Sequence, residues 1–467
     1  MLFQSFGFFV FFWIAFAVYW KLRAHRHRMV WLLAASILFY ALWNPWLITL
    51  IVFTAGMDYI CALRIESAPD ARSRRAWLLL SLVASLSLLC FFKYAQFLLE
   101  TTCGLLGIFG IHSSPPALHM VLPLGISFYT FETISYVVDV YRGRLKAERN
   151  VLHYALYIMF FPHLIAGPIV RPEQFLPQIR RPKHFDWMRL QLGAQLFMRG
   201  LFKKTVLSDR LASMADPIFR APGDFSTATL WLAAIGYAGQ IYCDFSGYTD
   251  MAIGAAHAFG FKLPQNFNRP YLADSVGEFW RRWHITLSTW LRDYLYIPSG
   301  GSRGGTWRTY RNLILTMGIA GLWHGPGWNF IIFGLMHGIA MTIERMLPQL
   351  QWARLAPVRV ARIAATFLFW SISLVFFRSK TLAAALTTLA RMFHPAAGQS
   401  PAQGVIAMAL IIMGCVFLGQ IAGGFTLWRR IETRIPAPVI GFALCCLFLL
   451  IQLLNPEYDS PFIYFQL

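Results

Sequence analysis

Two histidines in apolar surroundings are the side chains of this sequence best suited to acid–base chemistry. His324 lies in residues 321–329 (Gly-Leu-Trp-His-Gly-Pro-Gly-Trp-Asn), inside an apolar run from Leu313 to Met341. The run is long enough to cross a bilayer, yet Gly-Pro-Gly interrupts it, because proline lacks an amide donor and glycine loosens the backbone. An opened backbone at membrane depth is tolerated where protein buries it or where it lines a cavity. An ionisable group there is costly, so we expect His324 to be functional. The alternative is a histidine that bonds a neighbouring carbonyl in helix packing.

The second histidine, His284, lies in residues 278–296, where the spacing of apolar and polar side chains predicts one interfacial helix on the cytoplasmic side. One face of this helix would carry Phe279, Trp283, Leu287, Trp290 and Tyr294, and the opposite face would carry Arg281, His284, Ser288 and Arg292. The polar face would contact lipid phosphates or the mouth of a tunnel that receives an anionic donor, and periodicity does not separate these alternatives. Two histidines in facing apolar segments would suit proton transfer, because imidazole titrates near neutral pH.

Other chemistries find weaker support in the sequence. H-E-x-x-H and other paired ligand spacings are absent, so we expect no metal site. Ser246 lies in residues 243–247 (Cys-Asp-Phe-Ser-Gly), which differ from the G-x-S-x-G turn of serine hydrolases. The sequence contains no P-loop, so ATP-driven transport has no motif to support it.

The composition is that of a membrane protein. Of the 467 residues, 57% are hydrophobic and 13% are charged, whereas a soluble domain carries about 25% charged residues. The mean hydropathy is +0.52. A net charge of +20 is typical of basic loops that face the cytoplasm and anionic lipid. No soluble basic module is visible, which argues against nucleic-acid binding, and the seven scattered cysteines predict neither a zinc knuckle nor a disulfide framework.

Apolar runs predict how often the chain crosses the membrane. At the usual span length we expect roughly ten to twelve membrane segments, in one integral-membrane domain that covers residues 1–467. Residues 29–63 are too long for one span, so the chain should turn at Asn44-Pro45-Trp46. Residues 77–99 should cross outward.

Basic loops predict the orientation of these segments. We expect the cytoplasmic side to hold residues 64–75, 142–150 and 262–310, and the outside to hold residues 100–120, which contain no Lys or Arg. Residues 151–170 are apolar but are interrupted by prolines and a glycine, and basic residues flank both ends. This pattern favours a re-entrant segment over a crossing.

Several motifs between residues 120 and 340 resemble those of the membrane-bound O-acyltransferase family (MBOAT), most closely its bacterial alginate O-acetyltransferase branch. They occupy residues 124–129, 161–168, 244–254, 266–271, 278–298 and 321–325. The Trp-Arg-Arg-Trp-His and Leu-Trp-His-Gly blocks are highly specific together. The flanking segments agree with the family in hydropathy alone.

The resemblance implies an all-α polytopic membrane fold, a ring of about ten to twelve transmembrane helices with re-entrant and interfacial helices around a central tunnel. It also implies that His324 is the catalytic histidine and that His284 is a second active-site residue. Substrate contacts are expected from Arg281, Arg282, Ser288, Arg292, Trp323, Asn329, Asp244 and Ser246. The three arginines at a cytoplasmic tunnel mouth would attract a phosphorylated donor by charge.

The activity implied by the resemblance is O-acetyl transfer in the bacterial inner (cytoplasmic) membrane. A multi-pass enzyme would move an acetyl group from a cytoplasmic thioester donor, expected to be acetyl-CoA, for O-acetylation of an exported exopolysaccharide. The expected partners are this donor, a polysaccharide acceptor, membrane lipids and a periplasmic acetyltransferase of the SGNH type, with no tightly bound cofactor. Whether His324 acts as the base or carries the acetyl group stays open.

Residues 325–328 (Gly-Pro-Gly-Trp) differ from the pattern expected of the alginate branch, so the acceptor also stays open. Alginate, cellulose or another exopolysaccharide fits, and D-alanyl transfer to teichoic acid is a related but less similar activity. The alternative from another class is a polysaccharide-export transporter or scaffold without chemistry of its own, because broken helices and polar residues inside the membrane also mark transporters. A histidine pair without an ion-coordinating set of carboxylates favours the enzyme.

Overall fold

The computed structural model describes residues 2–118, 120–347, 355–423, 435–454 and 462–463. Within these ranges the chain is built from helices, so the predicted all-α class is confirmed. The described helices that are long and apolar enough to cross a membrane are Ile48–Ser67, Ala71–Ile108, Ala356–Arg378, Gln403–Ala422 and Ala437–Leu454. The predicted number of roughly ten to twelve crossings stays a prediction, because other described helices are shorter or more polar. Contacts group the chain into two compact units, and the single-domain interpretation also stays a prediction.

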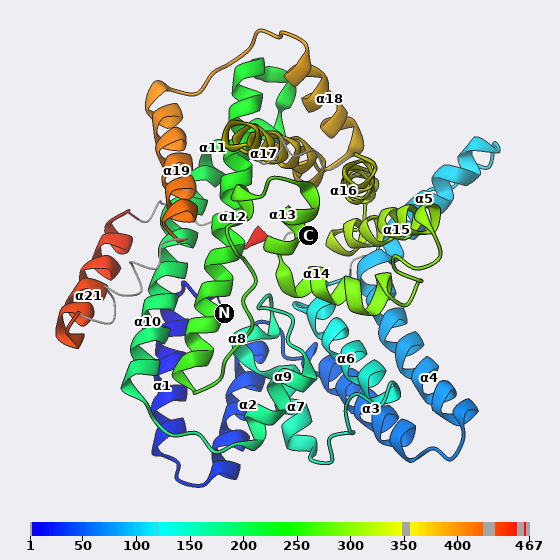
Figure 1. The fold of residues 1–467 in the computed structure, drawn as a ribbon, viewed down its shortest axis with the longest axis vertical. Helices are drawn as coiled ribbons and strands as arrows, with labels where there is room; N and C mark the ends of the chain where they lie inside the picture. Colours follow the sequence, from blue (N-terminus) through cyan, green and yellow to red (C-terminus); the bar gives the residue numbers. More distant parts are fainter. Residues whose placement is uncertain (1, 119, 348–354, 424–434, 455–461, 464–467) are drawn as a thin grey trace. The chain divides into compact units, whose positions relative to one another are not determined.

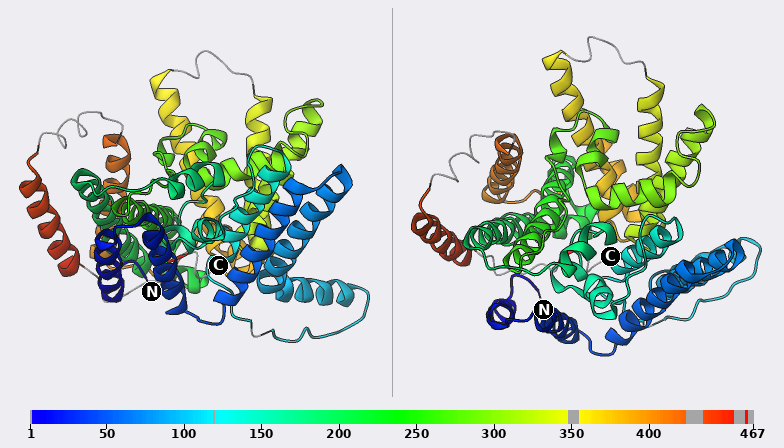
Figure 2. Two further views of the ribbon diagram at one scale, coloured as in Figure 1. Left: turned by 90° about the horizontal axis from the view of Figure 1, so that it is seen from below. Right: turned by 60° about the horizontal axis from the view of Figure 1, so that its bottom comes forward.

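The first unit comprises residues 1–197 and 251–264. It begins with α1 (Phe6–Lys21), α2 (His25–Ala41), α3 (Ile48–Ser67) and α4 (Ala71–Leu89). The turn predicted at Asn44-Pro45-Trp46 is confirmed, because α2 ends before it and α3 begins after it. α3 and α4 run side by side (Figures 1 and 2), and the buried Asp58 of α3 accepts hydrogen bonds from Ser81 and Ser85 of α4 at 2.5 and 3.2 Å.

The helix predicted over residues 77–99 is longer than expected. α4 continues through a π-helical turn, η1 (Cys90–Tyr94), into α5 (Ala95–Ile108). No proline interrupts this stretch, so the helix extends past residue 99, and the π-helical turn accounts for the change of direction between α4 and α5 (Figure 1). The irregular part of the loop predicted for residues 100–120 therefore begins only after α5.

The interruption predicted in residues 151–170 is confirmed. α6 (Ile126–Tyr141) precedes this segment, which contains α7 (Val151–Met159) and the short α8 (Phe161–Leu164), and α9 (Pro172–Arg180) follows. The irregular backbone around Val170 is buried, and the carboxylate of the buried Glu132 accepts the Val170 amide hydrogen at 3.0 Å. His163 Nδ1 lies 3.2 Å from the same carboxylate. Buried side chains thus satisfy the opened backbone, and its re-entrant placement in the membrane stays a prediction.

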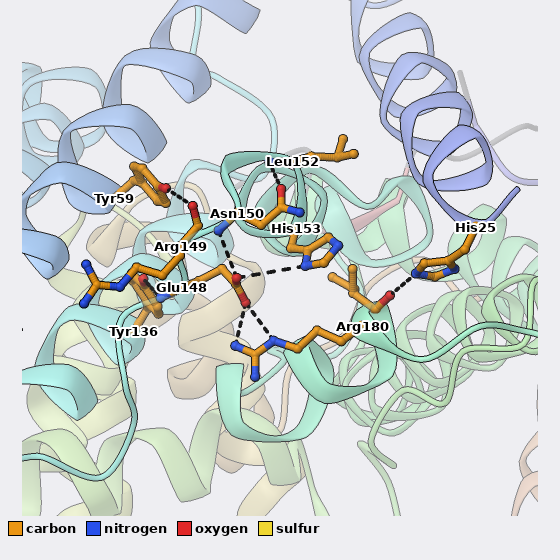
Figure 3. Close-up of polar contacts among 10 residues, drawn as sticks. His25, Tyr59, Tyr136, Glu148, Arg149, Asn150, Leu152, His153 and Arg180 are labelled. Atoms are coloured by element: carbon orange, nitrogen blue, oxygen red, sulfur yellow. Dashed lines mark hydrogen bonds and ion pairs between the residues drawn. The ribbon is translucent and has the colours of Figure 1, made fainter.

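A third buried carboxylate, Glu148, joins the loop after α6 to α9 (Figure 3). Glu148 accepts two hydrogen bonds from the Arg180 guanidinium at 2.6 and 3.0 Å and one from the Asn150 amide at 3.0 Å. Its own amide donates to the Tyr136 hydroxyl at 2.8 Å. These bonds fix the loop predicted for residues 142–150 against the rest of the first unit.

The second unit comprises residues 198–250 and 265–467, with α10 (Trp187–Phe202) and α12 (Thr227–Ala258) contributing to both units. Its smaller elements are η2 (Lys203–Ser208), α11 (Asp209–Arg220), η3 (Pro222–Asp224) and η4 (Pro270–Leu272). The elements that position the candidate site are α13 (Val276–Arg282), α14 (Ile285–Leu291), η5 (Arg292–Tyr296), α15 (Thr306–His324), α16 (Trp328–Met346) and α17 (Ala356–Arg378). α18 (Leu382–Phe393), α19 (Gln403–Ala422) and α21 (Ala437–Leu454) follow.

The helix break predicted at Gly-Pro-Gly is confirmed, but its form differs from the expectation of one interrupted crossing. α15 and α16 each have 19 residues and form an antiparallel hairpin, with the break as its turn. Gly321 and Gly334 allow the two backbones to touch, because a Cβ at either position would collide with the opposite helix. The expectation was wrong on this point because α15 begins seven residues before the apolar run and includes polar side chains such as Arg308 and Arg311.

Candidate active site

His324 is the last residue of α15 and lies at the turn of the helical hairpin. Its side chain is buried, with 3% of the residue exposed. The imidazole is surrounded by aromatic rings, with centroid distances of 5.0 Å to Trp323, 5.2 Å to Phe377 and 6.0 Å to Phe333. The three rings come from α15, α17 and α16, so three helices define the position of this histidine.

Two residues, Gly325 and Asn329, determine the form of the turn after His324. A Cβ at Gly325 would fall on the ring of Phe330, so this position requires glycine for space; its φ of −166° is ordinary extended backbone. Asn329, a predicted substrate contact, is buried and donates its amide hydrogen to the Ser379 carbonyl oxygen at 2.6 Å. The structure therefore gives Asn329 the role of tying the start of α16 to the end of α17.

The single helix predicted over residues 278–296 is wrong. α13 ends at Arg282 and α14 begins at Ile285, because His284 adopts a left-handed backbone conformation with φ of 42° and ψ of 54°. This break turns the His284 side chain into the protein interior, where 0% of the residue is exposed. Arg281 points to solvent with 72% of its side chain exposed, so the predicted shared face of Arg281 and His284 does not exist.

Both histidine rings lie close to one indole ring, that of Trp323. The Trp323 centroid is 5.9 Å from that of His284 and 5.0 Å from that of His324. His284 lies outside the candidate membrane spans of the described helices. Burial, and secondarily the charge of His324, lower the pKa of His284 well below its ordinary value, so His284 is neutral at neutral pH. The structure thus brings His324, His284 and Trp323 together, as expected of one site.

A cavity of about 1480 Å³ extends from Ile285, the residue after His284, between α13, α14, α15, α16 and α17. Among the predicted contacts, Arg281, Ser288 and Arg292 line this cavity. Its ionisable lining residues are four arginines and two carboxylates: Arg281, Arg292, Arg345, Arg362, Asp274 and Glu344. Sequence reasoning missed Arg345 and Arg362, which follow and precede apolar segments at the ends of α16 and α17. Their place at the ends of apolar segments was the signal in the sequence that could have identified them.

Several of the predicted arginines already have acidic partners. Glu278 accepts hydrogen bonds from Arg281 at 2.8 Å and from Arg282 at 2.7 Å, and Arg292 bonds Asp293 at 2.7 Å. Burial opposes ionisation of Glu278, but the bonds from Arg282 and Arg281 hold its pKa below the ordinary value. Arg282 also donates to a backbone carbonyl and is not among the residues that line the cavity.

Asp244 and Ser246 belong to a buried polar network of α12. Lys204 lies 2.9 Å from Asp244 and 2.7 Å from Asp209, and the second Asp244 oxygen accepts the Ile463 amide hydrogen at 2.8 Å. Lys203 donates to the Ser246 hydroxyl at 3.3 Å. Neither predicted contact lines the cavity, and their bonds are those of residues that hold the fold together.

A metal centre finds no basis in the described part of the chain, where no three His, Cys, Asp or Glu side chains converge as ligands. The site instead combines two buried imidazoles with a cavity rich in arginine. Such an arrangement can move a proton and can hold an anionic molecule, which are the tasks of a group-transfer enzyme with a charged donor.

Comparison with known proteins supports this interpretation. The model of the MBOAT, membrane-bound O-acyltransferase family, matches residues 146–386, which include both histidines. The chain is 43% identical over 396 residues to the probable alginate O-acetylase AlgI of Azotobacter vinelandii, covering 84% of this chain and 78% of the relative. It is 40% identical over 412 residues to the peptidoglycan O-acetyltransferase of Helicobacter pylori, covering 81% and 77%. A more distant relative is the teichoic acid D-alanyltransferase of Bacillus subtilis, with 31% identity over 254 residues, 50% of this chain and 61% of the relative. The chain therefore belongs to the membrane-bound O-acyltransferase family and is a multi-pass membrane acyltransferase.

Proposed function

We propose that the protein transfers acetyl groups in the bacterial inner membrane for the O-acetylation of an exported polysaccharide. The observation that carries this proposal is the pair of buried histidines close to Trp323, together with a cavity that reaches Ile285, the residue after His284, and is lined by four arginines. Two relatives are named as an alginate O-acetylase and a peptidoglycan O-acetyltransferase. Their names support acetyl as the transferred group and a glycan as the acceptor. Alginate, cellulose or a similar exopolysaccharide remains the acceptor class.

In this proposal His324 acts as the general base. Its imidazole takes the proton of an acceptor hydroxyl while the hydroxyl oxygen attacks the acetyl carbonyl carbon of a thioester. The new C–O ester bond forms, the C–S bond breaks, and the departing thiolate receives the proton. His284 supports this transfer as the second proton-handling group of the site. Base catalysis of this kind contributes about 10²–10⁴-fold in rate.

The donor is proposed to be acetyl-CoA, which enters from the cytoplasm. Its phosphates match the cavity, where arginines outnumber carboxylates, and the basic residues of segment 262–310 favour a cytoplasmic position for this side. The acetyl group would pass to the outer side, where a periplasmic acetyltransferase partner of the SGNH type completes delivery to the polymer.

The test compares polymer from cells that carry the wild-type protein or His324→Ala, with membrane abundance of the protein measured in parallel. We expect normal polymer export with loss of detectable acetyl esters by mass spectrometry. His324→Gln should behave in the same way, because glutamine keeps hydrogen-bonding capacity but accepts no proton at neutral pH. Exported and fully acetylated polymer would refute the catalytic assignment. Loss of export itself would favour the transporter alternative.

A separate test addresses the donor. Arg345→Gln and Arg362→Gln should each weaken binding of coenzyme A to the purified protein, and wild-type binding should weaken as salt is added. Arg359→Gln is the matched control, since Arg359 is exposed on the same helix as Arg362 but does not line the cavity. Binding that is insensitive to salt and to both changes would contradict a phosphate-bearing donor in this cavity.

A further inference from the structure

Asn266 is a fully buried side chain that no part of the proposed reaction uses directly. Its side-chain oxygen accepts hydrogen bonds from the Thr286 amide at 3.2 Å and from the Thr286 hydroxyl at 3.0 Å. The same oxygen lies 3.1 Å from Nδ1 of His284. Three polar groups of the segment that follows α13 therefore converge on one atom of Asn266.

These contacts determine the protonation of the imidazole. A backbone N–H can only donate, so the Asn266 atom that faces Thr286 must be the oxygen and not the amide nitrogen. An amide oxygen can only accept, so His284 Nδ1 must carry the hydrogen of the shared bond. In a neutral imidazole with hydrogen on Nδ1, the lone pair that accepts a proton is on Nε2.

The backbone around Asn266 holds this geometry in place. The Ile285 amide donates to the Asn266 carbonyl oxygen at 2.9 Å, and the Asn268 amide donates to the Arg282 carbonyl oxygen at 2.9 Å. These two bonds hold both sides of His284, whose left-handed conformation is strained and persists only where surrounding contacts impose it. The ring of Phe245 packs edge-on to the imidazole at 4.7 Å.

We propose that Asn266 is a positioning residue that fixes His284 with hydrogen on Nδ1 and thereby makes Nε2 its proton-accepting atom in acetyl transfer. This inference rests on the proposed function for its role in catalysis. The proton released by the acceptor hydroxyl resides on the histidine pair until it passes to the departing thiolate, and the fixed tautomer keeps one lone pair ready for it. Groups that orient metal-ligating histidines in the same way change activity by about 10–100-fold when they are removed, and we expect a similar factor for Asn266.

Charge at position 266 should alter the pH dependence of the reaction. Two side chains from other helices face His284: His324 of α15 and Phe245 of α12. The carboxylate of Asp244, next to Phe245 in the chain, pairs with Lys204 instead. His284 must be neutral to accept a proton, so activity is lost as pH falls through its pKa. In Asn266→Asp a carboxylate next to Nδ1–H favours the imidazolium and raises this pKa. The acidic limb of the rate profile should therefore move to higher pH, whereas a merely structural side chain would leave the limb where it is.

The experiment reads the tautomer directly and separately from activity. Nitrogen-15 NMR of the histidine-labelled full-length protein in micelles, with the His284 signals assigned by their loss in His284→Gln, should show hydrogen on Nδ1. Asn266→Leu should lose this preference. Hydrogen on Nε2 in the wild-type protein, or an unchanged tautomer in Asn266→Leu, would overturn the inference.

Activity is then followed as release of the coenzyme A thiol from acetyl-CoA by proteoliposomes that hold the protein, with the periplasmic acetyltransferase partner and the polysaccharide acceptor both supplied. Asn266→Leu should lose about 10–100-fold, and Asn266→Asp should retain most activity with a shifted acidic limb. Thr286→Val, which removes only the hydroxyl bond to the same oxygen and keeps the contact with Nδ1, should lose much less activity than Asn266→Leu. Equal loss in Thr286→Val and Asn266→Leu would contradict positioning through the imidazole. A wild-type protein without turnover would refute the proposed donor or function, while the NMR result still decides the tautomer.

Discussion

Gly325→Ala is the substitution that most directly tests whether the hairpin turn positions the catalytic histidine. The backbone at Gly325 is extended, so alanine is conformationally allowed there. The new Cβ would however lie 2.6 Å from both Cδ2 and Cζ of Phe330, where ordinary contacts are 3.4–4 Å. The Phe330 ring must therefore move by roughly 1 Å to relieve an overlap of this size.

This movement reaches the histidine through one further ring. Phe330 packs on Phe377 with centroids 5.4 Å apart, and Phe377 packs on His324 at 5.2 Å. Overpacking a close-packed interior typically costs about 1–3 kcal/mol. A displacement of about 1 Å of a catalytic group can cost on the order of 10²-fold in rate. We therefore expect a protein that still inserts in the membrane, with a modestly lower thermal midpoint and about 10²-fold less acetylation.

The matched control is Gly327→Ala in the same Gly-Pro-Gly sequence. A Cβ at Gly327 would meet its nearest atom, Phe330 Cδ2, at an ordinary 3.6 Å, and the φ of −171° suits alanine. Polymer acetylation by mass spectrometry and thermal unfolding of the detergent-solubilised protein should be close to wild type for this variant. Wild-type acetylation in Gly325→Ala, or equal losses in both variants, would refute the proposed link from turn to histidine.

Further predictions concern stability and orientation. Ile463→Pro removes the amide hydrogen that the buried carboxylate of Asp244 accepts. In thermal unfolding it should therefore destabilise the protein by about 1–3 kcal/mol relative to Ile463→Val. Glu148→Gln leaves the Arg180 guanidinium without its carboxylate and should lower the thermal midpoint more than Glu66→Gln, whose exposed ion pair contributes about 0–1 kcal/mol. His112→Cys, in the loop without Lys or Arg and in a variant whose seven native cysteines are replaced by serine, should react with an impermeant maleimide from outside intact cells; protection there would reverse the orientation.

The position of His324 could be predicted from the sequence because its causes are local. Glycine and proline interrupt a helix wherever they occur, and an apolar run identifies the helix that they interrupt. The helix break at His284 has no such local signal, since residues 281–287 contain neither residue. That break results from hydrogen bonds to residues 266–268, which lie on a separate segment of the chain and whose pairing depends on the tertiary fold.

The composition of the cavity was only partly predictable for a related reason. Arg281 and Arg292 belong to the basic motif that the sequence displays, whereas Arg345 and Arg362 come from two helices that meet this motif only in the folded protein. Helical periodicity assigns side chains to faces of one helix, but it does not identify which helices enclose a common space. The prediction that residues 278–296 share one polar face was wrong, because helical periodicity assumes an unbroken helix.

The geometry also limits how many protons the site holds. Charge on His324 disfavours charge on His284, and both imidazoles lie close to the indole of Trp323. A second proton would have to enter an apolar, fully buried pair of rings, which desolvation opposes. Burial and this repulsion therefore oppose protonation of both imidazoles at once. The proton taken from the acceptor hydroxyl must leave before the next hydroxyl can be activated, and the departing thiolate is the group in the proposed reaction that can accept it. Asn266 contributes to this cycle by keeping the Nε2 lone pair of His284 available whenever the pair is unprotonated.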